Sequence, residues 1–260
     1  MNNKKNNSNN IKEDFTWVFG RHSVFSVLEN PNRKVIKVLY YKKFYDYGND
    51  IKLRILKSDK ETLIKPVEKV IIDKIFNENV KHQGIIAKCR KLNFKSVDDV
   101  IKLYTNKLNK VGLILDGITD VNNIGSIYRS ALAFNVDFII TEKKNTPIEN
   151  GSLINASCGS FDQVNTYKTI NINSSIKKLK DHNWWIIGLD QDGDYELNNF
   201  LKNKKPEKNL LFILGSEGKG IRRLIKKNCD YLVKININKK SSSINVSNAA
   251  SILMYNLNCL

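Results

Sequence analysis

Three short segments in the second half of the chain carry polar residues that could do chemistry. They read DGITDVNNIGSIYRSA at 116–131, ILGSEGKGIRRL at 213–224 and SSINVSNAA at 242–250. Each follows an apolar run typical of a strand and leads into a helical pattern, so we expect all three at one edge of a sheet, where open α/β folds bind ligands. The candidate side chains are Asn123, Arg129, Glu217, Ser243 and Asn245. This set suits a ligand with an anionic partner and does not resemble a hydrolytic triad.

Arg129 is the hardest of these residues to explain by structure alone. It falls two turns into a predicted helix, close to Ile127 and Ala131, where an unpaired charge would be costly. A phosphate or carboxylate partner would satisfy the guanidinium. The sequence therefore predicts an anion next to this helix.

The other polar residues have simpler alternatives, which the sequence leaves open. Asn123 could cap its helix, and Glu217 could be a carboxylate favoured at a helix start by the dipole. Ser243, Asn245 and Ser247 alternate before an apolar helix, and a single cap does not need all three. We expect some of them to face the other two segments.

The turn of the second segment contains glycines at 215, 218 and 220. Their spacing matches neither the phosphate loop GxxxxGK[ST] nor the dinucleotide pattern GxGxxG. Such a turn can expose backbone amides and carbonyls to an adenine or a ribose. By itself it is weak evidence for a ligand.

The charge of the whole chain points to a polyanionic partner. Its 260 residues include 43 Lys plus Arg against 26 Asp plus Glu, a formal net charge of +17. Nucleic acid is the leading candidate for a protein with such an excess. The alternative is that lysines merely fill solvated faces.

Several classes of site and location are disfavoured. The cysteines at 89, 158, 229 and 259 form no metal-binding or disulfide pattern, which predicts no metal and a reducing compartment. The three histidines lie outside the polar segments, so a histidine base is not indicated. No apolar run of about 18 residues is present, and we expect a cytoplasmic protein.

The strand and helix patterns predict an α/β fold in two units. After a disordered basic tail at 1–15, we expect an N-terminal unit at 16–91, a loosely docked linker with one short helix at 92–108, and a larger unit at 109–260. In the first unit, Pro66 is expected to open a helix over PVEKVIIDKIF. In the second unit, strands and helices alternate, which predicts a mostly parallel sheet.

Six ordered segments resemble a known family. NNIGSIYRSA, ILGSEGKGI and SSINVSNAA look like the three motifs of the SpoU (TrmH-type) ribose 2'-O-methyltransferases of the SPOUT superfamily, and NASCGSFDQV resembles the segment between the first two motifs. FGRHSV and HQGIIA resemble the N-terminal domain of the bacterial enzymes that methylate guanosine in 23S rRNA. The resemblance covers residues 17 to 258.

The resemblance implies a fold, a cofactor and partners. It implies a C-terminal domain with a trefoil knot, S-adenosylmethionine as methyl donor, a homodimer that completes the site, and a small N-terminal domain that grips RNA. The expected substrate is a guanosine 2'-hydroxyl in 23S rRNA, with tRNA as one alternative and a non-catalytic RNA-binding protein as another. By position, Gly215, Ile235 and Ile244 would hold the cofactor. Asn123, Arg129, Glu217, Ser243 and Asn245 match the family's active-site positions.

The implied reaction gives Arg129 a chemical role. A ribose 2'-hydroxyl is a poor nucleophile until its proton is removed or its developing charge is stabilised. Because arginine titrates too high to be an easy base, we favour a role in orienting phosphate and hydroxyl and stabilising alkoxide, although the family is often described with arginine as the base.

The sequence departs from the family pattern at three positions. Val121 and Asn236 stand where proline is usual, and Asn248 replaces an apolar residue. We expect the loss of both prolines to loosen the loops that shape the pocket.

Overall fold

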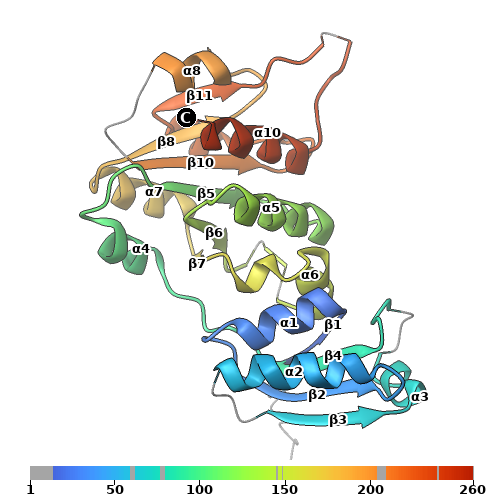
Figure 1. The fold of residues 1–260 in the computed structure, drawn as a ribbon. Coiled ribbons are helices and arrows are strands. Elements are labelled where there is room, and N and C mark those ends of the chain that lie inside the picture. The colour runs from blue at the N-terminus through green and yellow to red at the C-terminus, as the bar shows by residue number, and fades with distance from the viewer. Residues whose placement is uncertain are drawn as a thin grey trace, which may run out of the picture.

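The computed structural model folds into two units, each built on its own sheet (Figure 1). It describes residues 14–58, 62–76, 80–144, 146–147, 149–203, 209–238 and 240–259. The predicted tail at 1–15 lies almost entirely outside the described residues. Among the helices that are described, none combines the length and apolar character needed to cross a membrane.

The N-terminal unit is a four-stranded sheet with helices on both faces. Its elements are β1 (Phe15–Phe19), α1 (Arg21–Glu29), β2 (Val35–Tyr41), α2 (Tyr45–Ser58), β3 (Leu63–Val67), α3 (Lys69–Asp73) and β4 (Ile85–Arg90). The strand order is β1-β4-β2-β3, and only the β2–β3 pair is parallel. Alternate β2 residues divide between two cores: Val38 belongs to the main cluster beneath α1, and Leu39 packs with Ile72 of α3.

The structure differs from the sequence interpretation of this unit in two strands. Phe15–Phe19 form β1, a strand that the sequence patterns did not indicate, and it pairs with β4. Pro66 does not open a helix but lies in β3, opposite Tyr40 of β2. Because β3 is an edge strand, a residue without an amide hydrogen is tolerated there.

The segment between the two sheets packs more firmly than a loosely docked linker. Helix α4 (Val97–Tyr104) begins with a capping box formed by Ser96 and Asp99. It buries Val97, Val100 and Tyr104 in the core of the second unit. The helix is therefore part of that unit's packing.

The second unit is a seven-stranded sheet in which every pairing is parallel. The order is β7-β6-β5-β10-β8-β11-β9. The strands are β5 (Val111–Asp116), β6 (Phe138–Glu142), β7 (Thr166–Thr169), β8 (Trp184–Leu189), β9 (Tyr195–Glu196), β10 (Asn209–Gly215) and β11 (Tyr231–Lys234). The helices are α5 (Val121–Ala133), α6 (Gly151–Ala156), α7 (Ile172–Lys180), α8 (Leu197–Asn203), α9 (Arg223–Lys227) and α10 (Val246–Asn258), with a 3-10 turn at Ser160–Asp162. The predicted α/β class and mostly parallel sheet are confirmed; the trefoil knot and the domain boundaries stay predictions.

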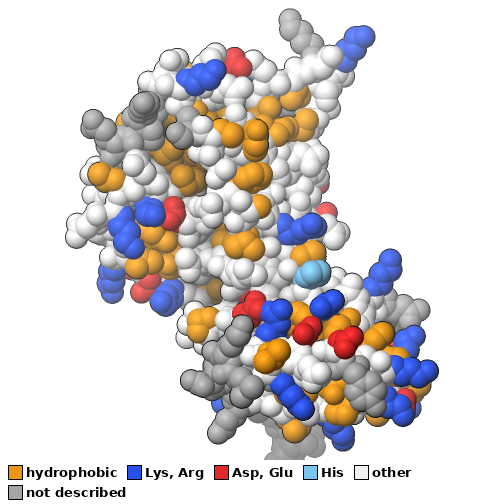
Figure 2. All heavy atoms as spheres, in the orientation of Figure 1, with side chains coloured by type: hydrophobic (Ala, Val, Ile, Leu, Met, Phe, Trp, Pro, Cys, Tyr) orange, Lys and Arg blue, Asp and Glu red, His pale blue; other side chains and the backbone are white. Residues whose placement is uncertain are grey.

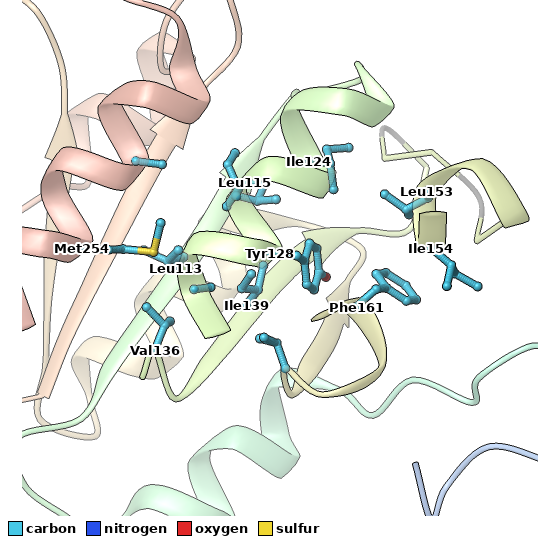
Figure 3. Packing of buried hydrophobic residues seen from close by; sticks show 14 of the residues in the cluster. Leu113, Leu115, Ile124, Tyr128, Val136, Ile139, Leu153, Ile154, Phe161 and Met254 are labelled. Atoms are coloured by element: carbon cyan, nitrogen blue, oxygen red, sulfur yellow. The ribbon is translucent and has the colours of Figure 1, made fainter. Parts of the chain in front are cut away.

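The core of the second unit lies on both faces of this sheet. Leu113 and Leu115 of β5 face α5 and α10, where they meet Tyr128 and Met254 (Figure 3). Ile114, the residue between them, faces the opposite cluster beneath α4, α7 and α9. This alternation is what a strand buried on both faces requires.

The two units are joined by a buried ionic contact. Arg33, which precedes β2, has a fully buried side chain and pairs with Asp162 at 2.8 Å and with Glu149, both from the second unit. Ser26 of α1 also donates a hydrogen bond to the Gly159 carbonyl at 2.6 Å. Burial alone lowers the pKa of Arg33, but the two carboxylates outweigh it, so the pKa is raised and the residue stays charged. The first unit is thus held in one orientation against the second.

Candidate functional site

The three polar segments meet at the carboxyl edge of the second sheet. β5 and β10 are parallel neighbours whose ends are in register, with Asp116 opposite Gly215. The first two segments leave the sheet side by side for that reason. The third segment reaches them through the start of α10, which packs against α5.

Three side chains, one from each segment, form a single hydrogen-bonded cluster. Glu217 Oε1 accepts from Asn123 Nδ2 at 2.9 Å and from Asn245 Nδ2 at 2.6 Å. Asn245 Nδ2 also lies 3.0 Å from Asn123 Oδ1. The sequence-predicted residues Asn123, Glu217 and Asn245 are therefore brought together.

The simpler explanations for two of these residues do not hold. Asp120, not Asn123, caps α5 by accepting from the Asn122 amide. Glu217 sits in the turn after β10, well before α9 begins at Arg223, so a helix dipole does not account for it. Asn245 does act as a cap, since its Oδ1 accepts from the Ser247 amide at 2.9 Å, and it joins the cluster as well.

The glycine turn holds Glu217 in place. Ser216 and Gly220 exchange two backbone hydrogen bonds, of 3.1 and 2.9 Å, which close a tight loop around Glu217. A Cβ on Gly215 would lie 2.2 Å from the Gly220 carbonyl carbon, so only glycine permits this approach. Gly218 has φ +77° and open space around it. The turn therefore presents both Glu217 and bare backbone to solvent.

A cavity of about 590 Å³ opens beside the cluster. One wall is apolar and includes Leu214, Ile235, Ile237, Ile244 and Val246. Gly215, Glu217, Ser243 and Asn245 also line it. The three residues expected to hold a cofactor, Gly215, Ile235 and Ile244, thus border one cavity.

The sequence interpretation missed the acidic side of this cavity. Asp190, Gln191 and Asp192 follow β8 and line the cavity together with Lys226. Lys226 donates to Asp190 Oδ1 at 2.8 Å, and this hydrogen bond raises the pKa of the lysine. The available signal was the polar run DQDGD directly after a buried strand, at the same edge as the other segments.

A second missed residue, Arg222, links the strand ends beneath the site. Its Nε donates to the buried Asp116 at 2.5 Å, and its Nη2 lies 2.8 Å from the buried Glu142. Burial acts to lower the pKa of Arg222, but the two carboxylates prevail and raise it. The arginine ties the ends of β5 and β6 to the turn that carries Glu217.

Arg129 lies outside the hydrogen-bonded cluster within this chain. Asn123 is buried on the inner face of α5, whereas Arg129 is exposed on another face. None of the residues in the described ranges forms an ion pair with it. The expectation that Arg129 lies in apolar surroundings is therefore wrong, because this face of α5 meets solvent within the single chain. The anion expected beside it stays a prediction.

Among the described residues, no three His, Cys, Asp or Glu side chains are grouped so that they could hold a metal ion. The polar cluster itself is built from two amides and one carboxylate, next to the Ser243 hydroxyl and the glycine turn. Such a set can orient a polar ligand group and accept a hydroxyl proton in a hydrogen bond.

Two protein-family models match the chain. The model described as the SpoU rRNA Methylase family matches residues 110–255, and the one described as RNA 2'-O ribose methyltransferase substrate binding matches residues 17–95. Together they cover both sheets.

Curated relatives match over most of their length. An uncharacterized tRNA/rRNA methyltransferase of Borreliella burgdorferi is 33% identical over 193 residues, which cover 72% of this chain and 82% of the relative. A Staphylococcus aureus protein assigned to the TrmH family of tRNA/rRNA methyltransferases is 32% identical over 246 residues, 92% of this chain and 94% of the relative.

Solved structures share the fold. The SpoU methyltransferase AviRb from Streptomyces viridochromogenes, in complex with AdoMet, matches with a TM-score of 0.76 at 19% identity, over 95% of this chain and 90% of that one. An AdoMet-bound rRNA methyltransferase from Sinorhizobium meliloti matches with a TM-score of 0.77 at 16% identity, over 95% of this chain and 87% of that one.

Proposed function

The chain belongs to the SpoU rRNA methylase family of RNA methyltransferases, and we propose that it transfers a methyl group from S-adenosylmethionine to a ribose 2'-hydroxyl of RNA. The observation that carries the proposal is the cluster of Asn123, Glu217 and Asn245 at the edge of the cavity. These groups can orient a hydroxyl through hydrogen bonds without any hydrolytic machinery.

The lining of the cavity offers apolar and polar groups that suit S-adenosylmethionine. Ile235 and Ile244 offer apolar surface for the adenine, and the turn at Gly215 and Gly218 gives close access to backbone groups. Asp190, which also lines the cavity, can accept hydrogen bonds from ribose or amino groups. When bound, the cofactor supplies an electrophilic methyl group on a sulfonium. The AdoMet bound to two proteins of the same fold supports this assignment.

The chain's own residues would prepare the nucleophile. Glu217 and Asn245 are joined by a hydrogen bond, and Ser243 lines the same cavity, so all three can position the 2'-hydroxyl. Arg129 would neutralise the neighbouring phosphate and the oxygen's developing charge. We assign it no role as a base.

The exposed position of Arg129 is one reason to propose a homodimer. Leu132 on α5, with Ile252 and Tyr255 on α10, is 37 to 57% exposed. Ser130 and Ser251 hydrogen-bond at 2.8 Å, which holds the two helices side by side. Figure 2 shows apolar side chains gathered over α5 and α10. If a second copy of the chain packs against this face, Arg129 of each subunit lies at the interface with the other subunit. Each site would then be completed by an arginine from the partner.

For the substrate, we propose a guanosine in 23S rRNA, with tRNA as the alternative. The N-terminal unit and the net charge of +17 support an RNA substrate. A third hypothesis, an RNA-binding protein without catalytic activity, is disfavoured by the hydrogen-bonded cluster around Glu217.

The test is methyl transfer from labelled S-adenosylmethionine to unmodified 23S rRNA and to unmodified tRNA, each in excess. We expect label at the ribose of 23S rRNA, with Glu217→Ala as the inactive control. Label in tRNA alone would replace the rRNA assignment. Label in neither RNA would overturn the proposed activity.

A further inference from the structure

A second pocket lies in the N-terminal unit, away from the proposed methyl-transfer site. Its volume is about 670 Å³, within the usual range for ligand sites. It is lined in part by the segments FGRHSV and HQGIIA, which the methyl-transfer site does not use. The Arg21 amide donates to Gln83 Oε1 at 2.8 Å and so joins the two segments at the pocket.

One wall of this pocket is aromatic and open. The Phe44 ring packs edge-on against Tyr41, with centroids 5.4 Å apart, and at 5.2 Å from Tyr47. A Cβ on Gly84 would lie 2.5 Å from the Phe44 ring, so the glycine allows the ring to rest on the backbone. Even so, Phe44 is 44% exposed. Its free surface is a platform on which another flat ring can stack.

The pocket also has basic side chains in its lining. Arg21, Lys69 and Lys81 line it and are exposed, and none of its described lining residues is an Asp or Glu. The nearby Asp73 is engaged with His82 Nε2 at 2.7 Å, and Asp50 pairs with Arg21 at 3.3 Å. Aromatic faces ringed by cations are how proteins bind unpaired bases together with their phosphates.

Elements that border the pocket and the methyl-transfer site begin on the same side of the molecule. In Figure 1 the first turns of α1 and α2, whose residues line the pocket, lie on the side where α10 begins. The buried Arg33 contact fixes the two units relative to each other. One RNA can therefore reach both places.

We propose that this pocket binds an unpaired nucleobase of the substrate RNA, stacked on Phe44, with its flanking phosphates held by Lys69 and Lys81. The proposal rests on the proposed RNA substrate. Gln83, whose side-chain oxygen is already engaged by Arg21, has an amide group suited to donate to the edge of the base.

The experiment uses the full chain and a 12-nucleotide single-stranded RNA that contains one 2-aminopurine, with the matched duplex as competitor. Binding and the fluorescence quenching caused by stacking are followed together. We expect Phe44→Leu, which keeps apolar bulk in the wall, to weaken binding about 5-fold or more and to lose the quenching, because a stacked base is worth about that much. Phe44→Trp should retain both. Lys81→Gln should reduce the salt slope by about 0.7.

Tyr195→Ala is the matched control, because Tyr195 is also 44% exposed but lies on β9 of the other unit. It should bind and quench like the wild type, and thermal melts verify that each variant is folded. Equal binding by Phe44→Leu and wild type, equal competition by the duplex, or no binding of the 12-mer by wild type would each overturn the pocket. Loss of quenching in Phe44→Leu, in a protein that methylates no RNA, would instead overturn the proposed activity and leave the pocket standing.

Discussion

At the scale of single residues, Asn245 uses both ends of one amide. Its Oδ1 accepts from the amide and the hydroxyl of Ser247, at 2.9 and 2.6 Å, and so begins α10. Its Nδ2 donates to Glu217 and Asn123. Since the amide cannot turn over without losing both sets of bonds, the helix cap also fixes the orientation of the polar cluster.

Asn245→Asp separates these two roles. Its carboxylate keeps an acceptor for the Ser247 amide, so we expect stability within about 0.5 kcal/mol of wild type. It also loses the donor to Glu217 and places two carboxylates in contact, which should lower kcat for methyl transfer about 10²-fold through misplacement of the hydroxyl. Urea unfolding and single-turnover methyl transfer measure the two effects. The matched control, Asn245→Ala, should lose activity and about 1 kcal/mol of stability together; an active Asp variant would remove Asn245 from the site.

At the scale of elements, the first turn of α5 has a backbone that accepts the proline usual at position 121 in the family pattern. Val121 is the first helical residue, and Asp120 before it has φ −71° and ψ 121°, an extended conformation that proline accepts in its predecessor. Proline is also favoured at this position because its missing amide hydrogen has no helical partner.

We therefore expect Val121→Pro to raise the free energy of unfolding by about 0.4 to 1 kcal/mol, because the unfolded chain loses freedom. Denaturant unfolding measures the change. Asn122→Pro, one residue later, removes an amide that donates to Asp120 at 2.8 Å and should destabilise the protein. If Val121→Pro lowers the free energy of unfolding as well, the expected stabilisation is contradicted. The loss in that variant would come from strain in the loop before α5 and not from a missing hydrogen bond.

The elements also mark how far the sequence alone could lead. β5 and β10 are buried runs of Leu and Ile bounded by polar turns, so their positions and parallel pairing could be predicted. Strand β3 could not be predicted, because Pro66 is typical of a helix start and its pairing with Tyr40 is not visible in the sequence. The surroundings of Arg129 on α5 could not be predicted either. Apolar neighbours in sequence do not show whether a helix face meets the core, water or another chain.

At the scale of the whole molecule, Arg33 decides whether the two units act as one body. Its guanidinium makes two bonds to Asp162, of 2.8 and 3.0 Å, and another to Glu149, all within the interface. Removing the cation would leave two buried carboxylates without compensation. That loss is strongly destabilising even where the intact pair contributes little.

Arg33→Met should lower the free energy of unfolding by about 3 to 5 kcal/mol, measured by urea denaturation. Lys178→Met is the control, because Lys178 pairs with Asp98 at 2.7 Å with both side chains more than half exposed. That variant should change stability by about 1 kcal/mol or less. Similar small losses in both variants would mean that the interface is held by its apolar contacts and the Ser26 hydrogen bond.

In the proposed dimer, Arg129 acts in a site that it shares with the partner subunit. Arg129→Ala should abolish turnover yet leave stability and cofactor affinity close to wild type, because Arg129 is exposed and does not line the cavity. Calorimetric loss of cofactor binding would contradict its assigned role. If each site combines Arg129 of one subunit with Asn245 of the other, mixed dimers of Arg129→Ala and Asn245→Asp contain one intact site.

A 1:1 mixture of these two inactive variants, after subunit exchange, should then recover about a quarter of wild-type activity, because half of the dimers are mixed and each has one complete site. Equal amounts of either variant with itself serve as the baseline. No recovery, with exchange verified by differently tagged subunits, would place Arg129 and Asn245 in the same subunit's site. The exposed face of α5 would then have to move toward its own cavity when RNA binds.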